Sequence, residues 1–399
     1  MKLNMKIFDS MKRLPLILVL LFAVFTPFVA SAQYNYPHPD NNDILLPAMR
    51  NTINGRTEVF IPQVNGYNVY KADLHIHTVC SDGQITPAHR VREAWRDGLD
   101  IIAIADHMEY RRFEKKFIEY LQDYFPEAIK VKNTTKDASE IKVDLNCSVK
   151  WAQKSAKDYP VLIIPAAEIT RSDGHYNALF STDNNVIPNA DPMQAIRNAK
   201  AQGCLVQHNH PGKRRPSIEM TDFEKAVYAE GLIDGIEVMN GEEFYPKVID
   251  RADEYGLYMS SNTDIHSNSE GDYEGTKLGR NMTLILSKEN SLEAIREALM
   301  AKRTICYSYD RFAGEESLLK DLFNACVSFS VVSRNEKKGT TKFTITNSSS
   351  LPFVVCLPGS DPQWIDPFKT VMVTGKDLRL EIVNMWCGGN SHPIVDVKF

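Results

Sequence analysis

Short apolar runs alternate with helical segments between residues 69 and 310. This alternation is the sequence feature that most constrains the fold of the 399-residue chain. Buried parallel strands read as near-continuous apolar runs, so we predict five of them in this region. The predicted strands are Ile101–Ala105, Val161–Ala167, Cys204–Gln207, Ile236–Met239 and Leu257–Ser261. Strand–helix alternation predicts a parallel sheet with helical crossovers, and both an open doubly wound sheet and a closed barrel fit it.

The helical segments carry recognisable start signals. Thr86 precedes Pro87, and Asp191 precedes Pro192, which is the arrangement of an N-cap followed by proline in the first turn. Two further helices are predicted from similar patterns. Thr221 with Glu224 forms a capping box, and Asn290 with Glu293 opens the last helix.

The two ends of the chain have different characters. From about residue 325 the chain is β-rich with Gly, Asn, Ser and Pro turns, which predicts a small β-sandwich over residues 320–399. This part could cap the barrel, bind a polysaccharide or dimerise. Residues 33–68 are rich in Asn and Pro and are predicted to form an extended arm.

Residues 1–32 are predicted to be a signal peptide. Basic residues precede the apolar stretch Leu14–Ala30, and Ala30-Ser31-Ala32 matches the small-residue site at which signal peptidase cuts. We therefore expect cleavage after Ala32 and a periplasmic or secreted protein without stable membrane insertion. An uncleaved membrane anchor is the alternative.

Histidines and carboxylates gather where the predicted strands end. His75 and His77 alternate along one strand, so they point to the same face. Further histidines and carboxylates lie at or shortly after the carboxyl ends of this strand and of the later predicted strands. They are Asp82, His107, Glu168, His175, His208, His210, Asp264 and His266. The carboxyl ends of parallel strands converge on one mouth, where this many groups need compensating charge. Divalent metals supply it, and mixed imidazole and carboxylate ligands favour Zn, Mn or Fe.

The order of these motifs resembles a known family. Asp73–Thr78 with Ser81-Asp82-Gly83, Ala105-Asp106-His107, Glu168-Ile169-Thr170, His210-Pro211 and Asp264-Ile265-His266 resemble the PHP (polymerase and histidinol phosphatase) domain. Five further strings are similar to the Sb-PDE family of bacterial phosphodiesterases: Glu93–Asp100, Gly174–Phe180, Asn209–Gly212, Gly235–Gly241 and Met282–Leu284.

The resemblance implies a distorted seven-stranded (β/α) barrel, spanning residues 69–310, with a trinuclear metal site. Three sets of ligands carry over to this sequence. The first metal would take His75, His77, Glu168 and Asp264; the second Glu168, His175 and His210; and the third Asp82, His107 and His266. Glu168 would bridge two of the ions. Some family members have His at the position of Asp82, which affects metal preference.

The implied chemistry is metal-assisted hydrolysis of a small-molecule phosphoester. We expect Glu168, His208 and Arg171 to be catalytic. Substrate contacts are expected from Arg171, His208, Lys213 and Tyr176. Asp73 is predicted to orient an imidazole of the metal site.

Two other functions stay open. One is a phosphomonoesterase of the histidinol-phosphatase type, and the other is a non-catalytic metal-binding or surface-binding protein. The net charge of −5 gives no sign of a nucleic-acid partner. Seven cysteines without a CxxC pattern argue against a zinc ribbon, while a Cys356–Cys387 disulfide stays open.

Overall fold

The computed structural model describes residues 55–113, 144–273 and 279–399. The predicted signal peptide and residues 33–54 of the predicted arm lie outside these ranges. Residues Gly55–Phe399 form one compact unit. None of the described helices has the length and apolar character needed to cross a bilayer.

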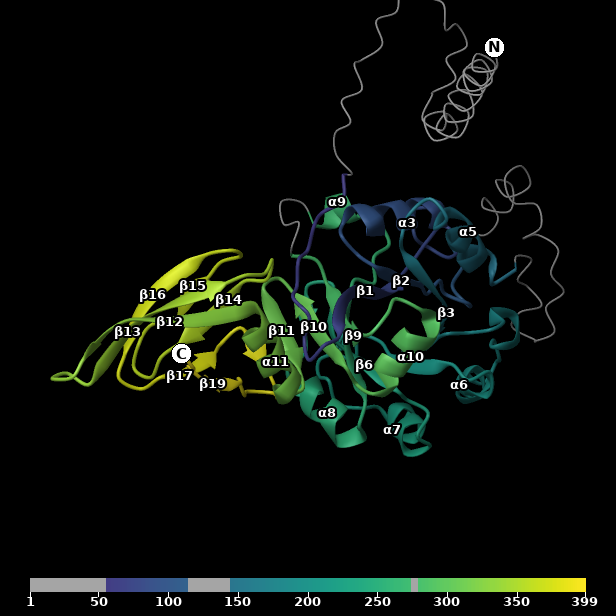
Figure 1. The fold of residues 1–399 in the computed structure, drawn as a ribbon. Helices are drawn as coiled ribbons and strands as arrows, with labels where there is room; N and C mark the ends of the chain where they lie inside the picture. The colour runs from purple at the N-terminus through teal and green to yellow at the C-terminus, as the bar shows by residue number, and fades with distance from the viewer. Residues whose placement is uncertain (1–54, 114–143, 274–278) are drawn as a thin grey trace, which may run out of the picture. The chain divides into compact units, whose positions relative to one another are not determined.

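A curled 12-stranded sheet forms the barrel, and helices surround it (Figure 1). Its strands are, in chain order, β1 (Asn68–Ile76), β2 (Ile101–Ile104), β3 (Leu162–Arg171), β4 (Gly174–Leu179), β5 (Leu205–His208), β6 (Gly235–Asn240), β7 (Glu243–Phe244), β8 (Tyr258–Asn262), β9 (Met282–Ser287), β10 (Thr304–Ser308), β11 (Arg311–Gly314) and β18 (Met385–Trp386). The parallel runs β1–β2–β3 and β5–β6–β8 confirm the expected α/β architecture.

The barrel closes between its first strand and the loop after β8. Ile76 and Ile265 form a parallel bridge, and the backbone N–H of His77 donates to the carbonyl of Ile265 at 3.0 Å. The N–H of Asp264 donates to the carbonyl of His75 at 2.8 Å. Closure therefore brings two predicted ligand segments, one from each end of the barrel sequence, into direct backbone contact.

Antiparallel strands make the barrel irregular, and the sequence rhythm did not predict them. β4 lies between β3 and β5 and is antiparallel to both. β9 pairs antiparallel with β1, and β10 and β11 extend the sheet from there. β18, which comes from the C-terminal region, completes this edge by pairing parallel with β11.

The helices cover the outside of the barrel. They are α3 (Pro87–Arg96), α5 (Cys147–Ser155), α6 (Pro192–Ala201), α7 (Asp222–Ala229), α8 (Lys247–Tyr255), α9 (Ser269–Asp272), α10 (Leu292–Met300) and α11 (Glu316–Cys326), with a 3-10 turn η4 (Asn184–Val186). The capping box of α7 is present as predicted. The predicted start of α10 was wrong by one residue, because the side chain of Ser291, rather than Asn290, accepts a hydrogen bond from the N–H of Ala294.

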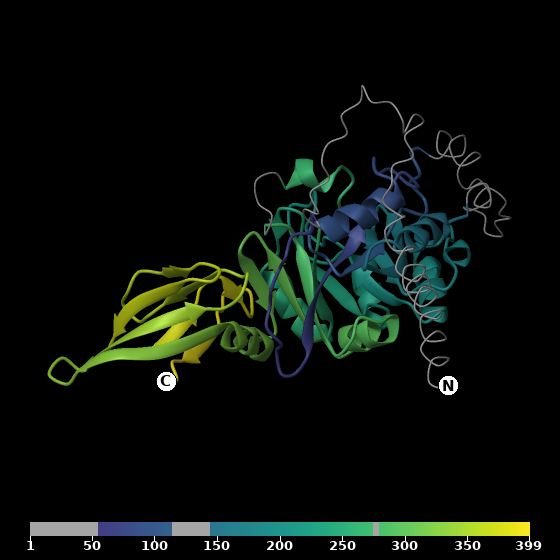
Figure 2. The same cartoon turned by 45° about the horizontal axis from the view of Figure 1, so that its top comes forward.

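The C-terminal region consists of two small sheets, as predicted (Figure 2). One contains β12 (Val327–Asn335), β13 (Thr340–Asn347) and β16 (Thr370–Gly375); the other contains β15 (Gln363–Ile365), β14 (Phe353–Cys356), β17 (Arg379–Ile382) and β19 (Ile394–Asp396). Phe343 of β13 and Phe353 of β14 belong to one buried cluster that also includes Phe312 of β11. Cys356 and Cys387 carry free thiols here.

Candidate metal centre

The carboxyl end of β1 places two imidazoles at the centre of the barrel mouth. His75 and His77 are fully buried, and their Nε2 atoms lie 3.1 Å apart. Oδ1 of Asp264 lies 3.3 Å from Nε2 of His75 and 3.0 Å from Nε2 of His77. Barrel closure supplies this third side chain, because Asp264 follows β8 and is hydrogen-bonded through its backbone to β1.

Glu168, near the end of β3, lies between several imidazoles. It is fully buried, and its Oε1 atom lies 3.4 Å from Nε2 of His75 and 3.2 Å from Nδ1 of His175. Its other oxygen lies 2.5 Å from Nδ1 of His107. His210, after β5, also faces Glu168 at 3.7 Å. His175 lies on the antiparallel strand β4, which the sequence analysis did not predict, and this strand brings it to the barrel mouth.

A second group of donors surrounds Asp82. Its Oδ1 atom lies 3.2 Å from Nε2 of His266 and 3.5 Å from Nε2 of His107. The ring of His77 stacks on that of His266 with centroids 4.2 Å apart. The loop after β1 therefore delivers a carboxylate to the imidazoles that follow β2 and β8.

All nine predicted ligands belong to four overlapping groups. Within each group, the donor atoms lie within 4.8 Å of one another. The groups are His77, Asp82, His107 and His266; His75, His210 and Asp264; His75, His77 and Glu168; and Glu168, His175 and His210. Within the part of the chain that the structure describes, Nδ1 of His77 is buried without a hydrogen-bond partner. An orphaned imidazole nitrogen among convergent imidazoles and carboxylates fits metal binding by chemistry and by geometry.

The electrostatics of the cluster also favour a bound cation. Burial alone would lower the pKa of His75, but three carboxylates led by Asp264 raise it well above its ordinary value. Burial would raise the pKa of Glu168, yet the charges of His107 and His75 hold it well below its usual range. Burial would lower the pKa of His107, but Glu168 raises it to about 10. Burial and the charge of His107 lower the pKa of His77 to about 4. The buried carboxylates of the cluster therefore favour positive charge nearby. Protonated imidazoles provide this charge without a metal, and a divalent ion would provide it when the imidazoles lose their protons and bind the ion.

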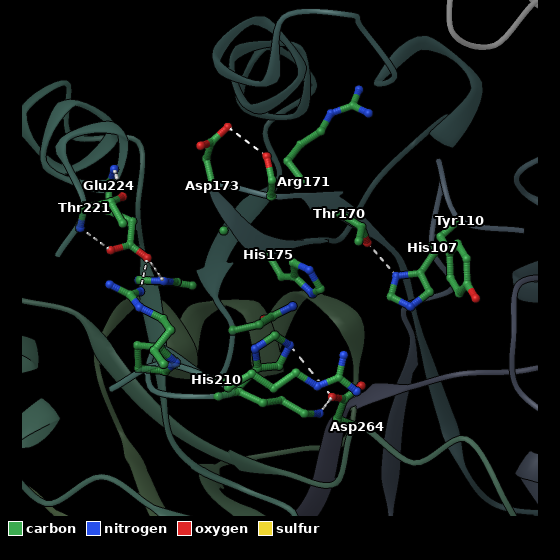
Figure 3. A pocket seen from close by; sticks show the side chains of 18 of the residues that line it. His107, Tyr110, Thr170, Arg171, Asp173, His175, His210, Thr221, Glu224 and Asp264 are labelled. Atoms are coloured by element: carbon green, nitrogen blue, oxygen red, sulfur yellow. Dashed lines mark hydrogen bonds and ion pairs between the residues drawn. The ribbon is translucent and has the colours of Figure 1, made fainter. Parts of the chain in front are cut away.

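A cavity of about 810 Å³ opens onto this cluster. Six of the nine predicted ligands line it: Asp82, His107, His175, His210, Asp264 and His266. Five basic side chains line it as well: Arg112, Arg171, Lys213, Arg214 and Arg215. In the close-up, His107 and Tyr110 stand on one side of His175 and His210, while Thr221 and Glu224 stand on the other (Figure 3).

The four residues expected to contact substrate are placed differently from one another. Lys213 lies in the cavity, and its Nζ atom binds Oδ2 of Asp264. Arg171 lines the cavity too, but its guanidinium pairs with Glu109 at 3.3 Å and points away from His175 (Figure 3).

The other two expected contacts, His208 and Tyr176, lie deeper. Nδ1 of His208 is 2.9 Å from the hydroxyl of Tyr228, and its Nε2 is 3.3 Å from Glu224. The ring of Tyr176 stacks on His208 and is almost fully buried. Protein groups therefore engage both nitrogens of His208, and its assignment to substrate stays a prediction.

Comparison with known proteins identifies the family. Residues 73–292, more than half of the chain, match the model of the PHP domain. A solved structure of a two-domain protein from Bacteroides vulgatus, which contains a predicted PHP-like metal-dependent phosphoesterase, is 32% identical in sequence. The match has a TM-score of 0.75 and covers 86% of this chain and 99% of that chain. The chain belongs to the PHP domain family. No curated protein matches it.

More distant structures resemble parts of this PHP-domain protein. A lesion-specific endonuclease from Pyrococcus furiosus is 17% identical, covering 62% of this chain and 59% of that chain at a TM-score of 0.38. An amidohydrolase from Chromobacterium violaceum is 15% identical, covering 50% and 88% respectively at a TM-score of 0.36. Neither similarity is close enough to support a conclusion about this chain.

Buried polar residues hold the ligands of the PHP domain in place, and the sequence had assigned one of them a different role. Asp73 was expected to orient an imidazole, but its carboxylate binds the backbone and hydroxyl of Thr263 and the guanidinium of Arg280. It therefore fixes the segment that leads into Asp264. The imidazole of His75 is instead held by Glu237, which lies 2.9 Å from its Nδ1 atom.

Glu237 and Asp106 are supporting residues that sequence reasoning did not single out. Asp106 accepts hydrogen bonds from the N–H and hydroxyl of Thr78 and from the hydroxyl of Ser81, so it shapes the loop that carries Asp82. A signal for Glu237 existed, since it is a carboxylate near the end of the predicted strand Ile236–Met239. Sequence analysis places Glu237 in that strand and in the family-like string Gly235–Gly241, and assigns it no role of its own.

Proposed function

We propose that this protein is an exported, metal-dependent phosphoesterase, and within that class a phosphodiesterase. One observation carries the proposal most directly. Nine imidazole and carboxylate side chains form four overlapping donor groups, and six of the nine line a cavity whose lining also includes five basic residues. Such a site suits an anionic substrate placed against metal ions.

Up to three divalent ions, of Zn, Mn or Fe, would be held by the nine residues. Glu168 belongs to two of the four donor groups, and its two oxygens face different imidazoles, Oε1 those of His75 and His175 and Oε2 that of His107, which supports its proposed role as a bridging ligand. When bound, the metals supply a water that is acidic enough to become a nucleophile and polarise the phosphoryl oxygens.

Side chains of the cavity wall would bind and orient the substrate. Lys213 is the best-placed cation, because its ammonium group already touches Asp264 at the edge of the cluster. Phosphate oxygens brought against the metals would lie within its reach. Arg171 and His208, which protein groups engage, would contribute only after exchanging those partners for substrate.

Room on both sides of the cluster favours a diester over a monoester. Tyr110 is 50% exposed and its ring lies edge-on to His107, so it offers an apolar surface at one end of the cavity. Thr221 and Glu224 line the other end. A diester needs space for two organic groups flanking phosphorus, whereas a monoester needs space for one. The likeness to Sb-PDE sequences around Gly174–Phe180 supports the same choice.

Comparing a diester with its monoester tests the proposal directly. We expect metal-loaded protein to hydrolyse bis-p-nitrophenyl phosphate with a larger kcat/KM than p-nitrophenyl phosphate, at one pH and with one metal. A monoester advantage of about tenfold, roughly 1.4 kcal/mol of transition-state preference, would make the protein a phosphatase. Failure on both substrates would favour the non-catalytic alternative.

Export is the second part of the proposal and has its own test. The motif Ala30-Ser31-Ala32 after an apolar stretch predicts a mature N-terminus at Gln33. N-terminal sequencing of protein recovered from the periplasm or medium should begin there. Intact Met1 on membrane-bound material would contradict cleavage.

A further inference from the structure

A single buried carboxylate connects two of the predicted metal positions. Glu237 lies on β6, has no exposed surface, and belongs to none of the four donor groups. Its Oε1 atom lies 2.9 Å from Nδ1 of His75, and its Oε2 atom accepts the backbone N–H of His210 at 2.7 Å. The family resemblance assigns His75 and His210 to different metals, so on that assignment Glu237 contacts a ligand of each.

The contacts of Glu237 fix the tautomer of His75. Both oxygens of Glu237 face N–H donors, namely the side-chain amides of Asn262 and Asn240 and the backbone of His210, so the carboxylate acts as an acceptor and the neutral imidazole of His75 carries its proton on Nδ1. Its lone pair then lies on Nε2, the nitrogen that faces His77, Asp264 and Glu168. Glu237 thereby presents His75 to the cluster in the form that binds a metal.

The second oxygen of Glu237 stabilises a strained backbone. His210 has a φ of 27°, in the left-handed region that non-glycine residues rarely adopt. A conformation of this kind costs on the order of 1–3 kcal/mol and persists only when its surroundings hold it. The hydrogen bond from the N–H of His210 to Glu237 is such a restraint.

Only a carboxylate satisfies all of these partners. Besides His75, Oε1 accepts from Asn262 at 2.9 Å and from Gln207 at 3.5 Å, and besides His210, Oε2 accepts from Asn240 at 2.8 Å, so each oxygen accepts from at least two donors. A glutamine at this position would turn its NH₂ group toward one of the two donor sets, whichever way the amide is oriented. It could not hold His75 and His210 at the same time.

We propose that Glu237 is a positioning residue that prepares two metal positions together, the one that includes His75 and the one that includes His210. The third position, formed by Asp82, His107 and His266, is independent of it. Among the described residues, Glu237 makes no hydrogen bond or ion pair with any of those three. The inference rests on the proposed metal site but not on the identity of the substrate.

Metal binding by the Glu237→Gln variant tests this inference without measuring turnover. Metal-free protein would be titrated with Mn²⁺ and separately with Zn²⁺ by calorimetry, and the ions retained after desalting would be counted by elemental analysis. We expect the affinity of two positions to fall by about 10- to 100-fold while the third keeps its affinity. The tightly held ions should drop from about three per chain to about one.

Asp144→Asn is the matched control. Asp144 is also a buried carboxylate with several donors, namely Asn146, Asn185 and Lys150, but it contacts none of the nine ligands. This variant should retain all of its ions. Loss of ions from Asp144→Asn would show that removing any buried carboxylate disturbs the site.

Each remaining outcome decides the question. Wild-type stoichiometry and affinity in Glu237→Gln would overturn the proposal, and so would an equal loss at all three positions. If Glu237→Gln does not fold, Glu237→Asp keeps the charge but is one methylene too short to reach both partners, and it should show the same selective loss. Metal binding without hydrolysis of any phosphoester would reject the proposed function and leave this inference standing.

Discussion

At the scale of single residues, Glu168 is the side chain on which the site depends most. It is fully buried and faces imidazoles from four different segments of the chain. Glu168→Gln keeps the size of the side chain and removes its charge, so we expect kcat/KM for the diester to fall by more than about 100-fold. Circular dichroism should show unchanged secondary structure.

His89→Ala provides the comparison for that variant. His89 lies on α3 with half of its side chain exposed and belongs to none of the donor groups. Its replacement should leave kcat/KM within about twofold, as is usual for surface substitutions. Equal losses in the two variants would mean that our separation of site histidines and carboxylates from background ones is wrong.

Individual ligands could be recognised from the sequence because their signal is local. His75 and His77 can be identified because they alternate along one predicted strand. Asp264 and His266 can be identified because they alternate just after another. Supporting roles could not be assigned in this way. Asp73 shares a strand face with His75, yet only the closed barrel brings Thr263 and Arg280 to its carboxylate. Which carboxylate orients which imidazole depends on contacts between residues more than 150 positions apart.

At the scale of elements, the parallel strands and capped helices were predictable, whereas the antiparallel strands were not. Helix signals such as Thr86-Pro87 act within one turn, so they can be read from neighbours. β4 begins at Gly174, with only two residues between it and the end of β3, and its buried part resembles any short apolar run. Its direction is decided by pairing with both β3 and β5, which is a tertiary interaction.

The start of α7 gives a prediction about pH and stability. Burial alone would raise the pKa of Glu224, but hydrogen bonds from His208, Arg215 and the backbone of Thr221 lower it to about 2. Because the folded-state pKa lies below the ordinary value of 4.5, this stabilisation is complete above pH 4.5 and is lost as pH falls toward 2.

Glu224→Gln should therefore cost about 2–3 kcal/mol of unfolding free energy at pH 7, and the difference from wild type should shrink by about half at pH 3. Urea unfolding at the two pH values measures this. A constant difference across that range would show that the capping hydrogen bond, rather than the charge, provides the stabilisation.

At the scale of the whole molecule, the metals should contribute to stability as well as to chemistry. Ions that bind only the folded chain stabilise it by mass action, by about 4 kcal/mol per site at a thousandfold excess over Kd. We expect about three ions of Zn, Mn or Fe per chain, a lower Tm after chelation, and recovery of both Tm and activity when metal is restored. Full activity in chelated protein that holds no metal would reject the site assignment.

The barrel and the C-terminal sheets share one hydrophobic core, which the change of sequence rhythm near residue 325 did not indicate. Phe353 of β14 stacks on Phe312 of β11 with ring centroids 5.6 Å apart, and it meets Phe323 of α11 edge-on at 5.2 Å. β18 adds a strand from the C-terminal region to the barrel sheet. A division into domains at residues 310–320 stays a prediction, and this shared core argues that the two parts unfold together.

Phe353→Ala tests that expectation, because it removes a fully buried ring at the junction and leaves the metal ligands untouched. We expect a loss of about 3–5 kcal/mol. If the core is cooperative, loss of diesterase activity, far-ultraviolet circular dichroism and tryptophan fluorescence should follow one denaturant midpoint in wild type, and all three should shift together in the variant. Activity that outlasts the unfolding of the C-terminal sheets would show instead that the barrel is stable by itself, and the variant would then lower only the first of two transitions.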